Sequence, residues 1–318
     1  MFFNSVMLLP YAVIIRLYSI VFPQNVLTVK NDSTFYNFLI GLLPSNTLFY
    51  NLLSILLVFF EAVLINRIVI KNRFSRDITL LPGMFFILLS SIYPGMQGIS
   101  PILLGTFFLI LSILNLFKTY KKFNSELYLF NTGLYLGIAS VIHYNLILMG
   151  IPIVLGYLYI KAFKFRELMQ LLSGVLVVFY FYAFYIFWAD KDFDFYINIH
   201  GLNFEFLQSN YTYLFFLMLF LLLSLLVAIK YRYFTIKKSI QSQNKINILS
   251  WVLTASILYV LFVDDKQNYN SLYLISFGLS YFISALFLRI KNNLLLEIVN
   301  VVIIFIILIY SFQFYNGF

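Results

Sequence analysis

The chain is organised as long runs of apolar residues separated by short polar breaks. A helix of about 20 residues, rising 1.5 Å per residue, matches a bilayer hydrocarbon core of roughly 30 Å. Eleven apolar runs of about this length lie near residues 4–23, 46–68, 79–94, 99–117, 127–143, 145–161, 168–189, 211–230, 247–264, 270–289 and 294–314. The pattern therefore predicts an all-α fold, a polytopic transmembrane helical bundle of about 11 spans.

Positive charges fall in every second gap between these runs. The cation-rich gaps hold Arg67, Lys71, Arg73 and Arg76, then Lys118, Lys121 and Lys122, then Lys161, Lys164 and Arg166, then Lys230, Arg232, Lys237, Lys238 and Lys245, and finally Arg289 and Lys291. The alternate gaps hold Lys30, Lys191 and Lys266 but carry more acidic residues. By the positive-inside rule the cation-rich gaps are cytoplasmic, which predicts a cytoplasmic N-terminus and a periplasmic C-terminus.

The composition agrees with a chain whose main partner is the lipid bilayer. Hydrophobic residues make up 62% of the sequence and charged residues 10%, a balance that no water-soluble core absorbs. The net charge of +9 is spread over five short gaps rather than one face, so we expect no nucleic-acid binding. The chain contains no cysteine, which excludes disulfides, thiolate metal sites and a cysteine nucleophile. Its richness in Phe, Tyr, Ile, Asn and Lys is typical of a low-GC bacterial genome and predicts the bacterial cytoplasmic (inner) membrane.

No soluble domain or low-complexity tail interrupts the runs, so we expect residues 1–318 to form a single integral membrane domain. The basic, polar stretch after residue 230 is the best place to divide it into a core, 1–230, and three last spans, 247–318.

The gap after the first run contains a predicted short helix over residues 34–43. Asp32 and Ser33 form a credible N-cap for this helix and Pro44 closes it. Its apolar residues share one face, so we expect it to lie flat in the membrane interface.

Arg16 in the first run and Glu61 in the second are ionisable residues inside predicted spans. Such a residue costs about 2.5 to 3.5 kcal/mol on insertion scales, so each needs a partner or a wet cavity. In straight helices their depths differ by about 12 Å, so a direct ion pair requires helix tilt or an intervening water. Three interpretations stay open: a structural ion pair or polar network, an Arg16 side chain that extends to the membrane surface, and a functional proton or ligand site.

The two histidines, His143 and His200, both fall on the predicted outer side. A two-histidine site is geometrically allowed, although a hydrogen-bonded turn residue is the simpler interpretation of His143. No spacing resembles a metal motif, a phosphate-binding glycine loop or a nucleophile elbow. We therefore predict no metal and no cofactor.

The order of features in roughly the first 190 residues resembles the membrane core of the GT-C glycosyltransferases, which use polyprenyl-linked sugars. The parallels are the loop helix at 32–44, the basic residues at 66–76 and the proline-containing hairpin at 93–101. This resemblance implies a polyprenyl-linked substrate and a catalytic carboxylate in the first outer loop, where Asp32 is the available acid. The family's second acid and its clustered phosphate-binding cations are missing from that loop, where Lys30 is the sole cation.

The stretch 92–166 also resembles a family of uncharacterised polytopic inner-membrane proteins from Bacteroidota. The similar parts are the Tyr-Pro turn, the end of one span at 115–118 and the end of the next at 142–144. This resemblance implies a flavobacterial type of host and supplies no reaction.

Three functions follow as alternatives. The first is a non-catalytic subunit or scaffold of a larger inner-membrane assembly, in envelope biogenesis or protein export, with other inner-membrane proteins as partners. The second is a GT-C-like glycosyltransferase that uses Asp32 and a polyprenyl-linked sugar donor. The third is a transporter in which Arg16, Glu61 and the 93–101 turn line a pathway, although the two halves show no convincing repeat.

Overall fold

The computed structural model describes residues 5–21, 33–44, 46–75, 79–122, 124–191, 195, 211–236, 238–263, 269–288 and 293–315, and these residues form helices and no β-strand. The all-α prediction is confirmed. Helices occupy each of the eleven apolar runs: α2 (Leu8–Ile15) with α3 (Leu17–Val21), α5 (Thr47–Lys71), α6 (Leu81–Ser90), α7 (Pro101–Lys118), α8 (Glu126–Ile142), η2 (Tyr144–Met149) with α9 (Gly150–Ile160), α10 (Phe165–Trp188), α12 (Tyr211–Ile229), α14 (Ile240–Phe262), α15 (Leu272–Phe287) and α16 (Asn293–Tyr315).

Among the described residues, five of these helices, α5, α7, α10, α12 and α14, are long and apolar enough to cross a membrane. The apolar helices α6, α8, α9 and α15 are shorter, at 10 to 17 residues, and pack beside them. The chain is therefore an integral membrane protein. Short elements complete the described fold: α4 (Thr34–Gly41), η1 (Pro94–Met96), α13 (Tyr231–Thr235) and η3 (Tyr269–Ser271).

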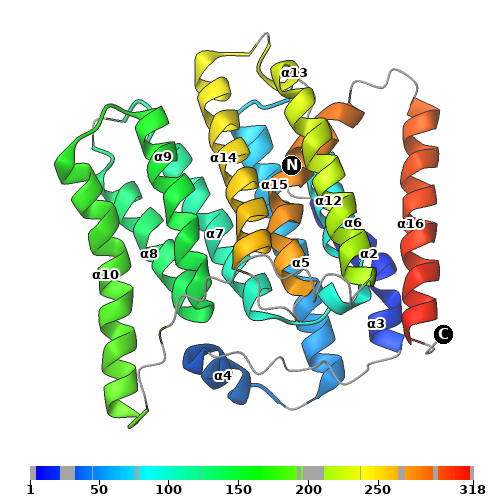
Figure 1. The fold of residues 1–318 in the computed structure, drawn as a ribbon, viewed down its shortest axis with the longest axis horizontal. Coiled ribbons are helices and arrows are strands. Elements are labelled where there is room, and N and C mark those ends of the chain that lie inside the picture. The colour runs from blue at the N-terminus through cyan, green and yellow to red at the C-terminus, as the bar shows by residue number, and fades with distance from the viewer. Residues whose placement is uncertain are drawn as a thin grey trace.

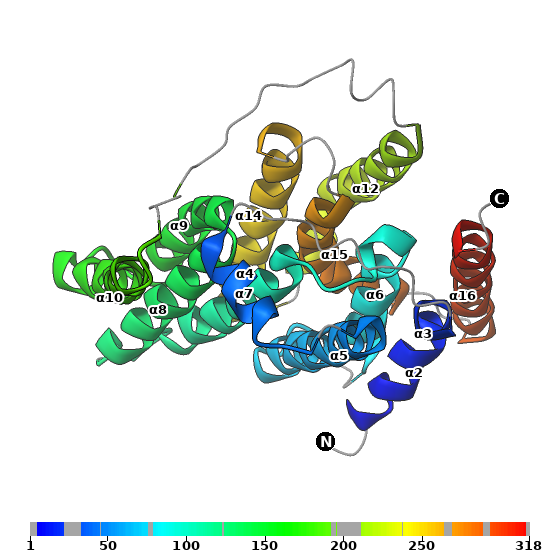
Figure 2. The same ribbon diagram turned by 90° about the horizontal axis from the view of Figure 1, so that it is seen from below.

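The long helices run between two ends of the bundle (Figure 1). One end holds α13, the end of α5 and the start of α14, and we call it the cation-rich end because it carries Arg67, Lys71, Arg73, Lys118, Lys121, Lys122, Lys161, Lys164, Arg166, Lys230, Arg232, Lys238 and Lys245. The opposite end carries α4, which lies across the ends of the long helices (Figure 2). We call it the α4 end.

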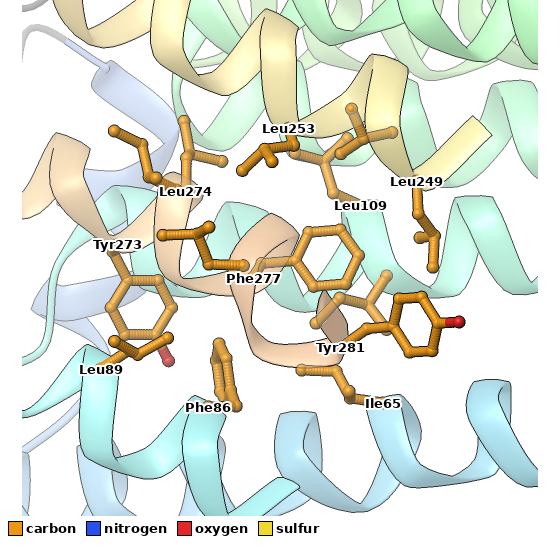
Figure 3. Close-up of a cluster of buried hydrophobic side chains, with 14 of the residues drawn as sticks. Ile65, Phe86, Leu89, Leu109, Leu249, Leu253, Tyr273, Leu274, Phe277 and Tyr281 are labelled. Carbon is orange, nitrogen blue, oxygen red and sulfur yellow. The ribbon is translucent and has the colours of Figure 1, made fainter. Parts of the chain in front are cut away.

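α15 forms the centre of the bundle. Every residue from Leu272 to Ser284 is buried, so this helix has no face left for lipid. Figure 3 shows its side chains Tyr273, Phe277 and Tyr281 surrounded by residues of α5, α6, α7 and α14. Its three serines donate to carbonyls of their own helix, at distances between 2.7 and 3.2 Å, which removes the cost of burying hydroxyl groups.

Glycines bring α8 and α10 into backbone contact. A Cβ atom on Gly133 of α8 would lie 1.9 Å from the Leu171 carbonyl oxygen of α10, and one on Gly174 of α10 would lie 2.2 Å from the Phe130 carbonyl oxygen of α8. Gly137 follows Gly133 by four residues on the same face of α8. This G-x-x-x-G spacing is typical of membrane helices that pack with their backbones close together.

The predicted loop helix is present as α4. The Ser33 hydroxyl accepts a hydrogen bond from the Tyr36 backbone N–H at 3.3 Å and caps the helix, which ends at Gly41. Phe38 and Leu42 are exposed. This exposed apolar side agrees with a helix that lies in the membrane interface.

Candidate functional site

Arg16 interrupts the first helical segment. α2 ends at Ile15, Arg16 adopts φ −100° and ψ 21°, and α3 follows. Side chains bind the carbonyl groups near this break: the Ser19 hydroxyl donates to the Arg16 carbonyl at 2.7 Å, and the Asn51 amide donates to the Ser19 carbonyl at 2.5 Å. A break inside a membrane helix is tolerated when neighbouring groups satisfy the backbone in this way.

The Arg16 guanidinium is completely buried and binds groups of α5, α6 and the turn that follows α6. Its Nε donates to the Ser91 hydroxyl at 2.9 Å, its Nη1 to the Gln97 carbonyl at 2.9 Å and its Nη2 to the Ser90 carbonyl at 3.2 Å. The Ser54 hydroxyl of α5 lies 3.4 Å from Nη1 and donates to the Gln97 carbonyl at 2.8 Å. The carbonyls at the end of a helix lack helical partners, so this one side chain supplies hydrogen bonds to several buried acceptors.

Glu61 lies near the middle of α5 and is also completely buried. Its carboxylate accepts hydrogen bonds from the Thr106 hydroxyl of α7 at 2.8 Å and from the Tyr273 hydroxyl of α15 at 2.5 Å. Figure 3 shows Tyr273 beside Phe86 and Leu89 of α6. Glu61 thereby ties α5, α7 and the central helix α15 together.

Arg16 and Glu61 do not bond to one another directly but are linked through α6. Arg16 donates to the Ser90 carbonyl of α6, and Tyr273, which donates to Glu61, packs its ring against Phe86 of the same helix with the centroids 5.5 Å apart. Arg16 also keeps its guanidinium inside the protein instead of extending it to the surface. We call this set of residues the Arg16–Glu61 network: Arg16, Ser54, Glu61, Ser90, Ser91, Gln97, Thr106 and Tyr273.

The first residues of α4 are bound to the α4 end of the bundle. The Ser33 hydroxyl donates to the Val141 carbonyl of α8 at 2.8 Å, and the Thr34 hydroxyl hydrogen-bonds to the Tyr182 hydroxyl of α10 at 2.7 Å. Tyr182 lies 2.6 Å from the Tyr144 hydroxyl, which accepts the Thr34 backbone N–H at 3.3 Å. Two tyrosines on different helices therefore fix where α4 begins.

Of the candidates predicted at this end, Asp32 and His200 lie outside the described residues. His143 ends α8, and its ring Nε2 lies 2.5 Å from the Tyr259 hydroxyl of α14. This hydrogen bond links α8 to α14. Within the described part of the chain, no three His, Asp or Glu side chains gather where they could hold a metal ion.

A small gap of about 10 Å³ lies between α7, α9, α14 and α15. Apolar side chains such as Leu109, Met149 and Phe277 line it. This volume has room for about one water molecule. The gap is therefore a packing defect and not a substrate site.

α10 lies at the edge of the bundle (Figures 1 and 2), and it exposes aromatic side chains. We call this surface the aromatic face of α10; its residues are between 56% and 82% exposed and comprise Tyr180, Phe181, Phe184, Phe187 and Trp188. The Phe184 and Trp188 rings stack with their centroids 6.3 Å apart. The opposite side of α10 packs on α8 through Gly174. The structure thus leaves a continuous aromatic surface on one of its outermost helices.

The chain matches no protein-family model, no curated protein and no solved structure. The resemblances to GT-C glycosyltransferases and to the Bacteroidota membrane-protein family therefore stay predictions.

Reasoning from the sequence identified the two charged members of the Arg16–Glu61 network and missed its neutral members. Serine and tyrosine give no signal there, because in apolar helices they commonly bond to carbonyls of their own helix. One signal was present in the uncharged 93–101 turn, which contains Gln97. Non-helical backbone at membrane depth must be covered by protein or water, and here the Gln97 carbonyl binds Arg16.

Proposed function

We propose that the protein is a bacterial inner-membrane protein with eleven spans, a cytoplasmic N-terminus and a periplasmic C-terminus. Two observations support this proposal. Each of the eleven apolar runs coincides with a helical segment, and most of the lysines and arginines that the structure describes lie at the cation-rich end, as the positive-inside rule requires of the cytoplasmic side. α4 would then lie at the periplasmic surface, where Phe38 and Leu42 meet the lipid headgroups.

We infer that the protein acts as a non-catalytic subunit or scaffold of a larger membrane assembly, and the aromatic face of α10 is the observation that carries this proposal. From Met218 to Ile229, the large exposed side chains of α12 are aliphatic, among them Leu222 and Leu225, and suit lipid tails. Over the last two turns of α10, from Tyr180 to Trp188, every large exposed side chain is instead an aromatic ring. Such rings are frequent anchors of protein interfaces. A transmembrane helix of another protein is the partner that fits this face.

A photo-crosslinking amino acid at Phe184 is expected to capture this partner in native membranes. The crosslinked product should have a defined mass, and its partner should also co-purify with the unmodified protein after gentle solubilisation and sizing. Mass spectrometry of the crosslinked and co-purified proteins checks both results. The physical reason is that Phe184 lies in the middle of the exposed rings, within reach of any helix packed on them.

The matched control is the same amino acid at Leu222 of α12, which is 61% exposed. This position should give lipid adducts only. If Phe184 also yields lipid adducts alone, and the protein elutes as a lone chain, the scaffold proposal is wrong.

The binding of α4 supports a second candidate, a GT-C-like glycosyltransferase. Ser33, the residue that follows Asp32 in the sequence, is held by the Val141 carbonyl, and Thr34 is held by Tyr182. Catalytic groups work best beside residues whose positions are locked in this way. A carboxylate next to this anchor is suited to act as the general base of a sugar transfer.

Under this second candidate, Asp32→Asn is expected to lower sugar transfer from a polyprenyl-phosphate-linked donor by at least about 100-fold. Radiolabelled donor incubated with membranes that contain equal amounts of each variant provides the measurement. Asp190→Asn is the control, because Asp190 is an exposed acid with a φ of 47°, which asparagine tolerates. Equal transfer by both variants rejects the transferase.

A further inference from the structure

Five cations meet at the cation-rich end where α5, α7 and α14 come together. We call them the lysine cluster: Arg67, Lys71, Lys118, Lys122 and Lys245. Two come from the last turns of α5, two from the end of α7 and the residues after it, and one from the second turn of α14. Segments distant in the sequence thus bring like charges to one place.

Lys245 is the buried member of the cluster, with 3% of its surface exposed. Its ammonium donates to the Asn72 side-chain oxygen at 2.7 Å and lies over the rings of Phe117 and Tyr120, at 5.6 and 5.5 Å from their centroids. The Ser242 hydroxyl, one turn earlier in α14, donates to the Asn72 carbonyl at 3.0 Å. Packing and hydrogen bonds therefore fix the position of this charge.

The other lysines are arranged around a second ring. Lys122 lies 4.1 Å and Lys118 lies 5.8 Å from the centroid of Tyr128, whose hydroxyl accepts a hydrogen bond from Lys122 at 2.8 Å. Lys71 lies within electrostatic range of both Lys118 and Lys245. These rings and amide oxygens offer partial negative charge only, so the five positive charges repel one another.

Carboxylates distinguish this cluster from its neighbours at the same end. Lys161 pairs with Glu167 at 2.7 Å, and Arg166 pairs with Glu126 at 3.1 Å. Within the described ranges, no carboxylate forms such a pair with any member of the lysine cluster. Fixed cations without carboxylates are the arrangement expected of a site for an external anion.

We propose that the lysine cluster binds the phosphate group of an anionic ligand at the cation-rich end of the bundle. A phosphate oxygen accepts hydrogen bonds from several ammonium groups at once, and lysine is a common phosphate ligand. Tyr120 and Tyr128 add the aromatic surface found where proteins meet the headgroup region. The phosphate belongs to a phospholipid headgroup or to a soluble phosphate compound, and the site does not depend on the function proposed above.

The test compares two double variants that each lose two exposed cations from the same end of the bundle. Lys71→Gln with Lys122→Gln removes two members of the cluster, whereas Lys164→Gln with Lys230→Gln leaves the cluster intact. Native mass spectrometry of the purified full-length protein measures retention of phosphatidylglycerol against phosphatidylcholine. Thermal unfolding in detergent with and without inorganic pyrophosphate measures binding of a soluble phosphate.

The cluster variant is expected to bind its phosphate ligand about tenfold more weakly than the wild type, and the control variant to bind it as the wild type does. Selective retention of phosphatidylglycerol assigns the site to a lipid headgroup, and stabilisation by pyrophosphate assigns it to a soluble phosphate compound. The lipid-free cluster variant should also unfold at the same temperature as the wild type or higher, because repulsion is relieved. Equal losses in the two double variants, or no binding of either probe, overturn the proposal.

Discussion

Replacing Arg16 with methionine is expected to lower the free energy of unfolding by about 3 kcal/mol or more. Methionine fills a similar volume but donates no hydrogen bond, so the Ser90 carbonyl and the Ser91 hydroxyl each lose the guanidinium as a partner while buried. The measurement is denaturant or thermal unfolding of purified protein in detergent. The loss of unfolding free energy should exceed that caused by replacing any single exposed residue, because the Arg16 side chain binds groups of α5, α6 and the turn after α6.

The control for this experiment is Arg166→Met. The Arg166 side chain is 80% exposed and its partner Glu126 is 40% exposed, so removing this surface pair should cost less than about 1 kcal/mol. Arg16→Lys adds a second comparison, because lysine keeps the charge but lacks the planar fork that reaches three acceptors. The free energy of unfolding of Arg16→Lys should lie between those of the wild type and Arg16→Met. Equal losses of unfolding free energy in Arg16→Met and Arg166→Met would show that the Arg16 guanidinium does not hold these segments together.

The positions of the helices follow from apolar run length and from capping residues. The run 46–68 forms α5, and Ser33 is the N-cap of α4, with its hydroxyl bound to a backbone N–H of the first turn. The third helix is shorter than its apolar run predicts. The run covers residues 79–94, whereas α6 ends at Ser90. The chain leaves the helix there, and the Ser90 and Gln97 carbonyls bind Arg16.

The packing of these helices could not be predicted from the same pattern. In water, a buried face is apolar and an exposed face is polar, so periodicity shows which side faces inward. In a membrane both faces are apolar, and small or hydroxyl-bearing residues decide the contacts instead. Nothing in the hydropathy of the run 270–289 marks it as the central helix, yet α15 is buried all round.

The Arg16–Glu61 network was hidden for a related reason. The estimated difference in depth of about 12 Å assumes two straight helices, whereas the first segment breaks at Arg16 itself. The intervening distance is then covered by Ser90 and Tyr273, which lie far from Arg16 in the sequence and carry no charge. The two charges are visible in the sequence, but their connection depends on Ser90 and Tyr273, which only the fold brings together.

Adding one methyl group at Gly133 is expected to lower the free energy of unfolding by about 3 kcal/mol, near the upper end of overpacking costs. The new Cβ would meet the Leu171 carbonyl oxygen at 1.9 Å, and a backbone atom cannot rotate away as a side chain does. α8 and α10 would have to separate. Unfolding of Gly133→Ala in detergent, followed alongside the wild type, measures this cost.

Gly41→Ala is the matched control, since a Cβ there meets nothing within 4 Å. Alanine in an open helical position should be neutral or stabilise the protein by about 0.5 to 1 kcal/mol, so the same chemical change should lower the free energy of unfolding only at Gly133. Gly174→Ala tests the contact from the other helix, at 2.2 Å from the Phe130 carbonyl oxygen. Because either methyl group forces the same separation, the double variant should lose less stability than the sum of the two single losses. Strict additivity would mean that the two glycines act in separate contacts and that α8 and α10 do not share one close backbone interface.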